Sequence, residues 1–372
     1  LNLLATKLYI PPGRKNHVPR PRLTQTLEQA RQQNKKLTLV SAPAGYGKTT
    51  LVTEWLSGSP TKTAWLSLDE GDNDPARFLA YLIAALMQID ERIGMETLPM
   101  LQSPGPLPPE LVLTSLINDL DSSSREVALV LDDYQYISSQ AVHELTAFLL
   151  EHHPQTLHVV IASRSDPLLP LARLRARGQA VELRGDDLRF TEREAAQFLN
   201  EVMGLRLDAR SVAALEERTE GWIAGLQMAA LSMRDRDNVP KFIKGFSGTN
   251  RYILDYLLDE VLANQSPEIQ HFLLYTSILQ RLTAALCDAI REKDEASRRK
   301  RDDQTAHSES SHSGKSAAIL EYLERANLFL VPLDDDRKWY RYHHLFADLL
   351  QTQLLKILGT QGVAQLHLGA AA

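Results

Sequence analysis

The chain has 372 residues, enough for two or three domains. Its 41 basic and 47 acidic residues leave a net charge of −6, which argues against a protein that mainly coats nucleic acid by neutralising phosphates. Cys287 is the only cysteine, so a disulfide framework is excluded. No apolar run reaches the length of a membrane span and the first residues lack a signal-peptide pattern, so we expect a cytoplasmic protein.

The first 187 residues alternate short apolar runs with amphipathic stretches. Such runs are typical of strands that are covered on both faces of a parallel sheet. The predicted strands are residues 36–41, 63–68, 127–132, 157–162 and 180–183. Alternation of strands and helices predicts a doubly wound α/β domain.

Helix-start signals mark both halves of the chain. Asp74 precedes Pro75, a capping residue followed by proline at the first helical position. Thr191 and Glu194 form a capping-box pattern. After residue 187 the strand signals nearly vanish, so we expect helical domains there.

A charged, serine-rich and histidine-containing stretch interrupts the second half at residues 291–315. It has too few apolar residues to bury a core, and we expect a flexible insertion. A metal site at His307 and His312 is the weaker alternative. Residues 328–342 then predict a short hairpin, and residues 345–358 a last helix. Helices followed by a hairpin favour a winged-helix unit.

The strongest motif is the glycine-rich run at residues 42–50, which follows a predicted strand and opens a helix. This context predicts a P-loop, whose backbone N–H groups face the phosphates of a nucleotide. Lys48 is expected at the β- and γ-phosphates and Thr49 at Mg²⁺. A glycine-rich turn without a ligand is the alternative. The expected nucleotide-binding residues here are Ala44, Gly45, Tyr46, Gly47, Lys48, Thr49 and Thr50.

Two carboxylates end the apolar strand at residues 127–132. Phosphoryl-transfer sites need a carboxylate for the Mg²⁺ shell and a group that orients the attacking water. We therefore assign Asp132 to Mg²⁺ and Asp133 to water activation. As turn or cap residues, the two would have no catalytic role.

Arg164 follows the predicted strand at residues 157–162. Ligands of open α/β sheets bind at the carboxyl ends of the strands, so Arg164 is a candidate sensor of the γ-phosphate. A plain surface arginine is the alternative. Arg173, Arg175 and Arg177 are expected on a solvated helix face rather than at an interface between protomers.

The acidic run at residues 69–74 lacks the spacing of a calcium-binding loop. We expect it to serve as a capping loop.

Taken together, residues 42–50, 69–78 and 340–346 resemble the MalT-type, large LuxR-like regulators, which belong to the signal-transduction ATPases with numerous domains. The resemblance covers nearly the whole chain and begins at Thr6. It implies a P-loop NTPase domain at residues 1–187, a helical domain at 188–250 and a winged-helix domain at 251–356. Residues 357–372 would begin a further helical segment of a longer protein.

The resemblance also implies a switch that binds ATP, ADP and Mg²⁺. ADP would hold the chain in a closed resting state, ATP would permit self-association, and slow hydrolysis would reset it. An unknown inducer would bind a sensor beyond the C-terminus of this chain. No direct DNA binding and no membrane association are expected from this portion.

Single residues follow from the same resemblance. Val18 and Arg20 match the segment that packs near the adenine, and His343 matches a histidine that approaches the β-phosphate of ADP. His344 is an adjacent competitor. Gln227 stands where many relatives carry proline, which puts its nucleotide contact in doubt. Two other functions stay open: a P-loop kinase or ATPase that acts on a substrate, and a module that binds nucleotide without hydrolysing it.

Overall fold

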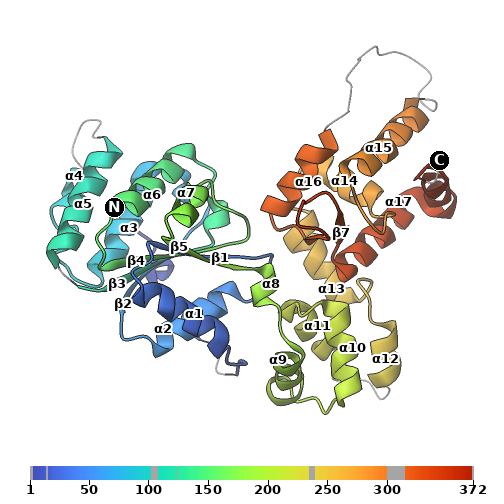
Figure 1. Cartoon of the computed structure of the whole chain (residues 1–372), viewed down its shortest axis with the longest axis horizontal. Helices are drawn as coiled ribbons and strands as arrows, with labels where there is room; N and C mark the ends of the chain where they lie inside the picture. The colour runs from blue at the N-terminus through green and yellow to red at the C-terminus, as the bar shows by residue number, and fades with distance from the viewer. Residues whose placement is uncertain are drawn as a thin grey trace. The chain divides into compact units, whose positions relative to one another are not determined.

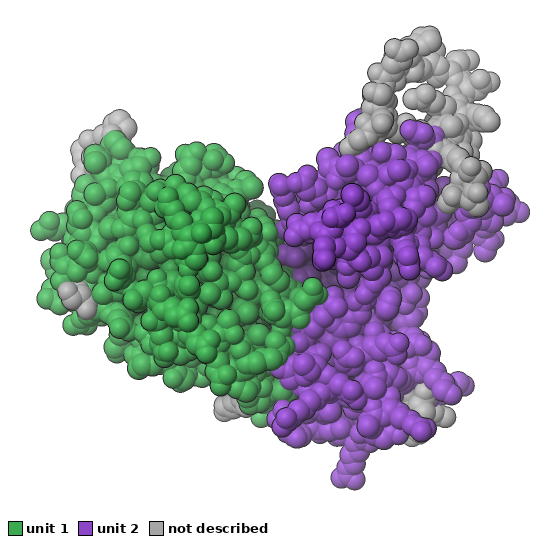
Figure 2. All heavy atoms as spheres, viewed as in Figure 1, with its two compact units in different colours: residues 1–42, 46–188 green, residues 43–45, 189–372 purple. Residues whose placement is uncertain are grey.

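The computed structural model describes residues 3–13, 16–101, 108–123, 125–233, 239–299 and 315–370. The chain divides into two compact units (Figure 2). The first unit holds residues 1–42 and 46–188, and the second holds residues 43–45 and 189–372. Among the described helices, none combines the length and apolar content that a membrane crossing requires.

The first unit is built on a five-stranded, fully parallel sheet in the order β2-β3-β4-β1-β5. The sequence prediction of five parallel strands is confirmed, with small shifts at the strand ends. Parallel pairing explains the continuous apolar runs, because helices cover both faces of such a sheet. The strands are β1 (Leu37–Ser41), β2 (Lys62–Ser67), β3 (Val127–Asp132), β4 (Leu157–Ser163) and β5 (Ala180–Arg184).

Helices flank this sheet on both sides (Figure 1). Helices α1 (Pro21–Gln32) and α2 (Lys48–Gly58) lie on one face. The opposite face packs against an apolar core that includes residues of the helices α3, α5, α6 and α7. The remaining elements of the unit are η1 (Ala5–Leu8), η2 (Glu70–Asn73), α3 (Pro75–Met87), α4 (Thr97–Met100), α5 (Pro109–Ser123), η3 (Tyr134–Tyr136), α6 (Gln140–His152), α7 (Leu171–Ala176) and α8 (Gly185–Leu188).

The acidic run before α3 is a capping loop, as predicted. Asp74 accepts a hydrogen bond from the Arg77 backbone N–H at 2.8 Å and so caps α3. Asp72 is fully buried, where its carboxylate pairs with Lys7 and accepts the Asp69 backbone N–H at 2.9 Å. These contacts fasten the N-terminal segment to the sheet domain and commit the Asp72 carboxylate to structural partners.

The second unit is mainly helical and contains a small antiparallel hairpin of β6 (Leu330–Pro332) and β7 (Tyr340–Tyr342), which precedes its last helix. The predicted hairpin and the capping box at Thr191 and Glu194 are confirmed. The other elements are α9 (Glu192–Gln197), η4 (Phe198–Val202), α10 (Ala209–Thr219), α11 (Ile223–Met233), α12 (Val239–Gly245), α13 (Arg251–Leu257), η5 (Leu258–Leu262), α14 (Pro267–Thr276), α15 (Ala284–Arg299), α16 (Lys315–Arg325) and α17 (His344–Ala370).

Two helices of this unit run further than the apolar pattern indicated. Helix α15 continues to Arg299, into the segment predicted to be a flexible insertion, because Glu, Lys, Ala and Arg residues have high helix propensity. Residues 300–314, with His307 and His312, lie outside the described residues, as do residues 102–107. Helix α17 passes residue 358 through a kink at Gly359, where φ is +67°.

Candidate functional site

The glycine-rich loop joins β1 to α2, as a P-loop does. Gly45 and Gly47 have φ of +77° and +80°, a conformation that side chains disfavour and glycine adopts freely. Lys48 begins α2 and is only 8% exposed. Its ammonium donates to the Ala42 carbonyl oxygen at 2.8 Å. The loop therefore places backbone N–H groups and one buried cation at a helix N-terminus, which suits an anion.

The Lys48 ammonium lies in an environment that disfavours its charge. Burial, followed by the positive charge of Arg164, lowers the pKa of Lys48 to about 8. Two cations that disfavour each other at the end of a sheet would be stabilised together by a polyanion such as a triphosphate. The electrostatics of the site thus fit a nucleotide.

Thr49 and Asp132 meet, as the sequence predicted for two Mg²⁺ ligands. The Thr49 hydroxyl donates to the Asp132 carboxylate, with distances of 3.2 and 3.0 Å to its two oxygens. Burial, together with the nearby Asp133, raises the pKa of Asp132 to about 6. Within the described residues no group of three or more His, Cys, Asp or Glu side chains could hold a metal. A bound Mg²⁺ here would need phosphate and water oxygens to complete its shell.

Asp133 follows β3 with a left-handed backbone, φ +57° and ψ +39°. Its Oδ1 accepts a hydrogen bond from the Gln135 side-chain amide at 2.8 Å. The oxygen of the same amide accepts the backbone N–H of Arg164 at 2.8 Å. Sequence reasoning missed Gln135, because no motif singles out a glutamine two residues after an acidic pair. The structure thereby joins the two candidates Asp133 and Arg164 through one side chain.

A further network at the same sheet end also escaped the sequence. The Ser41 hydroxyl at the end of β1 donates to Asp166 at 2.9 Å, and Asp166 pairs with Arg184 at the end of β5. Arg184 also pairs with Glu182, which in turn pairs with Arg175. This network ties the ends of β1, β4 and β5 together below the P-loop. It also gives Arg175 a partner within its own unit.

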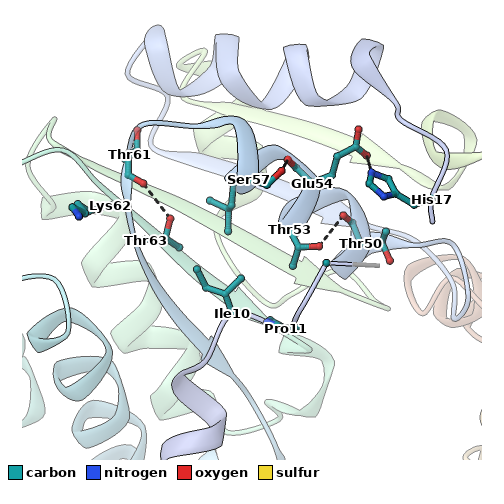
Figure 3. Close-up of a pocket in the computed structure, with 12 residues that line it drawn as sticks. Ile10, Pro11, His17, Thr50, Thr53, Glu54, Ser57, Thr61, Lys62 and Thr63 are labelled. Carbon is teal, nitrogen blue, oxygen red and sulfur yellow. Dashed lines mark hydrogen bonds and ion pairs between the residues drawn. The ribbon is translucent and has the colours of Figure 1, made fainter. Parts of the chain in front are cut away.

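A cavity of about 350 Å³ lies beside α2 (Figure 3). Its walls come from the N-terminal segment, from α2 and from the start of β2. His17 lies 4.0 Å from Glu54, which accepts the Arg20 backbone N–H at 2.9 Å. Residues that line the cavity are Ile10, Pro11, Gly13, His17, Thr50, Thr53, Glu54, Leu56, Ser57, Thr61, Lys62 and Thr63.

The predicted adenine-side residues, Val18 and Arg20, adjoin this cavity in the chain. Val18 is buried at 4% exposure. The guanidinium of Arg20 donates to the Leu188 carbonyl oxygen at 2.9 Å. Thr50 is the member of the predicted P-loop that lines the cavity.

The tip of the P-loop, residues 43–45, groups with the second unit. The indole N–H of Trp222 donates to the Ala44 carbonyl oxygen at 2.9 Å, and the Ala224 N–H donates to the Gly45 carbonyl oxygen at 3.2 Å. A Cβ at Gly45 would lie 2.5 Å from the Ala224 Cβ. Trp222 is fully buried, and its role as a partner of the loop was not foreseen from the sequence.

His343 lies in the second unit at 1% exposure, against the rings of Trp222 and Phe329. Its Nε2 lies 2.9 Å from the Thr219 carbonyl oxygen, so Nε2 carries the proton and donates. Nδ1 is buried with no hydrogen-bond partner. Burial lowers the pKa of His343 to about 4, which makes the ring neutral at pH 7. His344, by contrast, is exposed.

Glu220, just after α10, is a second feature that sequence reasoning missed. Its two carboxylate oxygens accept from the Arg341 guanidinium at 2.7 and 2.8 Å, and Oε1 also accepts the His344 backbone N–H at 3.0 Å. Burial opposes the charge, but the Arg341 hydrogen bonds prevail and lower the pKa of Glu220 to about 2. This carboxylate fastens the end of α10 to β7 and the start of α17.

Two domain families match the sequence. Residues 11–162 match the AAA ATPase domain, and residues 258–361 match the MalT winged helix domain. The described sheet and P-loop lie largely within the first match, and the hairpin lies within the second.

Curated relatives align with nearly all of the chain. The HTH-type transcriptional regulator MalT of Klebsiella pneumoniae is 33% identical over 371 residues, 99% of this chain and 38% of the regulator. The serine/threonine-protein kinase PknK of Mycobacterium tuberculosis is 33% identical over 358 residues, 95% of this chain and 30% of the kinase. The chain thus spans about a third of the length of these relatives.

Among solved structures, a Walker-type ATPase of Pyrococcus abyssi superposes with a TM-score of 0.58 at 16% identity. The match covers 91% of this chain and 97% of the ATPase, and at this identity it shows the fold alone. Fold, P-loop geometry and both domain matches agree. The chain therefore carries an AAA ATPase domain ahead of a MalT winged helix domain, and it is similar to MalT over nearly its whole length.

Proposed function

We propose that this chain is a nucleotide-operated switch, the regulatory ATPase portion of a MalT-like transcriptional activator. ADP holds the resting state, ATP permits self-association, and slow hydrolysis returns the chain to rest. The observation that carries the proposal is the contact of Thr49, at the start of α2, with Asp132, at the end of β3, beside the buried Lys48 ammonium. A cytoplasmic location follows from this role.

Each side chain of the site is proposed to have its own role in phosphoryl transfer. Lys48 binds phosphate oxygens, and Thr49 with Asp132 would hold Mg²⁺. When bound, Mg²⁺ supplies positive charge that offsets the charge of the phosphates. Asp133 orients and deprotonates the attacking water, and Arg164 senses the γ-phosphate. Each of these groups ends a strand or begins a helix of the first unit, so the sheet fixes their separation.

The base of the nucleotide is proposed to lie beside the N-terminal segment. Thr50 connects the P-loop with the cavity of Figure 3, whose walls mix hydroxyl groups with apolar side chains. Val18 and Arg20 follow His17 in the chain and support that wall. A mixed wall of this kind suits a flat heterocycle that carries few polar atoms.

His343 is proposed to read ADP. Its Nε2 proton is committed to Thr219, so contact with a phosphate requires protonation of Nδ1 or a turn of the ring. We expect His343→Ala to weaken ADP binding more than ATP binding. The matched control is His344→Ala, which removes the exposed neighbouring ring. Equal losses for both nucleotides, or a larger effect of the control, would contradict this assignment.

The names of the relatives state different activities, which supports a shared regulatory module rather than one particular activity. The same region of about 360 residues aligns with a protein named as a transcriptional regulator and with one named as a protein kinase. We therefore propose that inducer recognition and the final output, including any DNA binding, belong to parts of the full-length protein outside these residues.

Nucleotide that co-purifies with the protein tests the proposal most directly. ADP released on denaturation, with turnover far below one per second, supports the switch. Fast turnover without inducer favours the alternative of an ATPase or kinase that acts on a substrate. Bound nucleotide with no turnover, unchanged in Asp133→Asn, favours a binding module.

A further inference from the structure

Gln135 links two predicted functional groups with the two ends of one side chain. Its amide nitrogen lies 2.8 Å from Asp133 Oδ1, and its amide oxygen lies 2.8 Å from the backbone nitrogen of Arg164. A backbone N–H can only donate, so the amide oxygen must face Arg164. The amide N–H₂ therefore faces Asp133 and donates to its Oδ1. Chemistry thus fixes the orientation of the amide.

The backbone around Gln135 is anchored on both sides. Tyr134 is buried, and its hydroxyl lies 3.2 Å from His143 Nδ1. Asn73 donates to the Tyr136 carbonyl oxygen at 2.8 Å and accepts the Ser138 N–H at 2.7 Å. The short helix η3 is consequently held from two directions, so its middle residue has little freedom to move.

The bond to Asp133 uses only Oδ1, so it fixes the rotation of the carboxylate and leaves Oδ2 able to accept from a water molecule. Asp133 itself has a left-handed backbone, which a non-glycine residue keeps only where the surroundings enforce it. A general base works only when it is held within hydrogen-bonding reach of its proton. Gln135 supplies that restraint from η3, where its amide oxygen accepts the N–H of Arg164 at the end of β4.

We propose that Gln135 is a positioning residue for ATP hydrolysis, which aligns the Asp133 carboxylate and couples it to the strand end that bears Arg164. The inference rests on the proposed function, because it assumes that Asp133 activates water. Gln135 acts through Asp133 and Arg164 and is not assigned any contact with the nucleotide.

Two variants distinguish the hydrogen bond of Gln135 to Asp133 from its hydrogen bond to Arg164. Gln135→Met keeps the length of the side chain and removes both hydrogen bonds. Gln135→Glu keeps an acceptor for Arg164 but replaces the donor to Asp133 with a second carboxylate. We expect both to lower kcat about 10- to 100-fold while KM and the ATP dissociation constant change less than about threefold.

Amide hydrogen exchange at Arg164 gives a readout that does not depend on turnover. In the nucleotide-free protein, Gln135→Met should speed exchange of this amide about tenfold or more, whereas Gln135→Glu should leave it protected. Equal melting temperatures for both variants and the unmodified chain show that the fold is retained.

The outcomes distinguish this inference from the proposed function. If kcat of both variants stays within about threefold while Arg164 exchange accelerates in Gln135→Met, the bridge is structural only and the inference fails. If Asp133→Asn turns over as fast as the unmodified chain, or if that chain shows no turnover above Lys48→Ala, the proposed function fails and the inference with it.

Discussion

Buried charged groups have opposite surroundings in the two units. In the first unit, burial and the nearby Arg164 lower the pKa of Lys48, and burial and the adjacent Asp133 raise the pKa of Asp132. In the second unit, Glu220 is surrounded by opposite charge, and its pKa is lowered. The charges of the first arrangement are not balanced without a charged ligand, whereas Glu220 is balanced by Arg341 within the chain. Binding chemistry is therefore expected in one and structural locking in the other.

Lys48→Ala tests the P-loop site of the first unit and should have the largest effect. Removing the only ammonium in the loop should weaken ATP binding about 1,000-fold, or about 4 kcal/mol. Titration with a fluorescent ATP analogue measures this loss. Lys35→Ala, which removes a half-buried lysine bonded to the Gly178 carbonyl oxygen, is the matched control. Unchanged affinity in Lys48→Ala would overturn the P-loop assignment.

Glu220→Gln tests the ion pair of Glu220 with Arg341 in the second unit. It removes the charge that faces the Arg341 guanidinium, and we expect the second unit to lose about 3 kcal/mol of unfolding free energy. Urea unfolding followed by the fluorescence of the buried Trp222 measures the change. Glu217→Gln, at an exposed position of the preceding helix α10, should cost less than about 0.5 kcal/mol. Equal effects of the two substitutions would refute the locking role.

The pH dependence of stability sharpens the contrast. An unfolded histidine takes up a proton below about pH 6.5, whereas buried His343 stays neutral down to a pKa of about 4. The unfolded state then binds more protons, so stability falls as pH falls from 6.5 to 4, by about 2 kcal/mol between pH 7 and pH 5.

Unfolding midpoints of the unmodified chain and of His343→Leu at pH 7 and pH 5 measure this contribution. The variant should be less stable at pH 7 but should lose less stability on acidification. Parallel losses in the two proteins would show that His343 does not carry the effect.

Asp74→Ala should have the smallest effect. Asp74 accepts the Arg77 N–H at the start of α3, away from the charged cluster of the P-loop, and loss of such a cap costs about 1 kcal/mol. Thermal unfolding should show the loss, while ATP affinity stays unchanged. A change in affinity would mean that the capping loop and the nucleotide site are coupled.

Local patterns predicted much of this protein. Five strands, the helix start at Asp74, the capping box at Thr191 and the hairpin near residue 340 are each encoded within a few neighbouring residues. The P-loop and the pair at Asp132 are equally local. Periodicity and capping act over one or two turns, so the sequence records them directly.

The partners of the functional side chains were not predictable in this way. Gln135 meets the Arg164 backbone 29 residues away, and Glu220 meets Arg341 across 121 residues. No short pattern encodes such a pairing, because it arises only when the sheet order β2-β3-β4-β1-β5 and the helical packing bring distant segments together.

By itself, the sequence determined which segments are strands, where the phosphate loop lies and which carboxylates end β3. Tertiary structure alone decided that Gln135 links Asp133 with β4, that His343 is buried with its Nε2 proton committed to Thr219, and that Glu220 is neutralised by Arg341. The physical reason is that hydrogen-bond partners and burial depend on neighbours in space, whereas helix, strand and loop signals depend on neighbours in the chain.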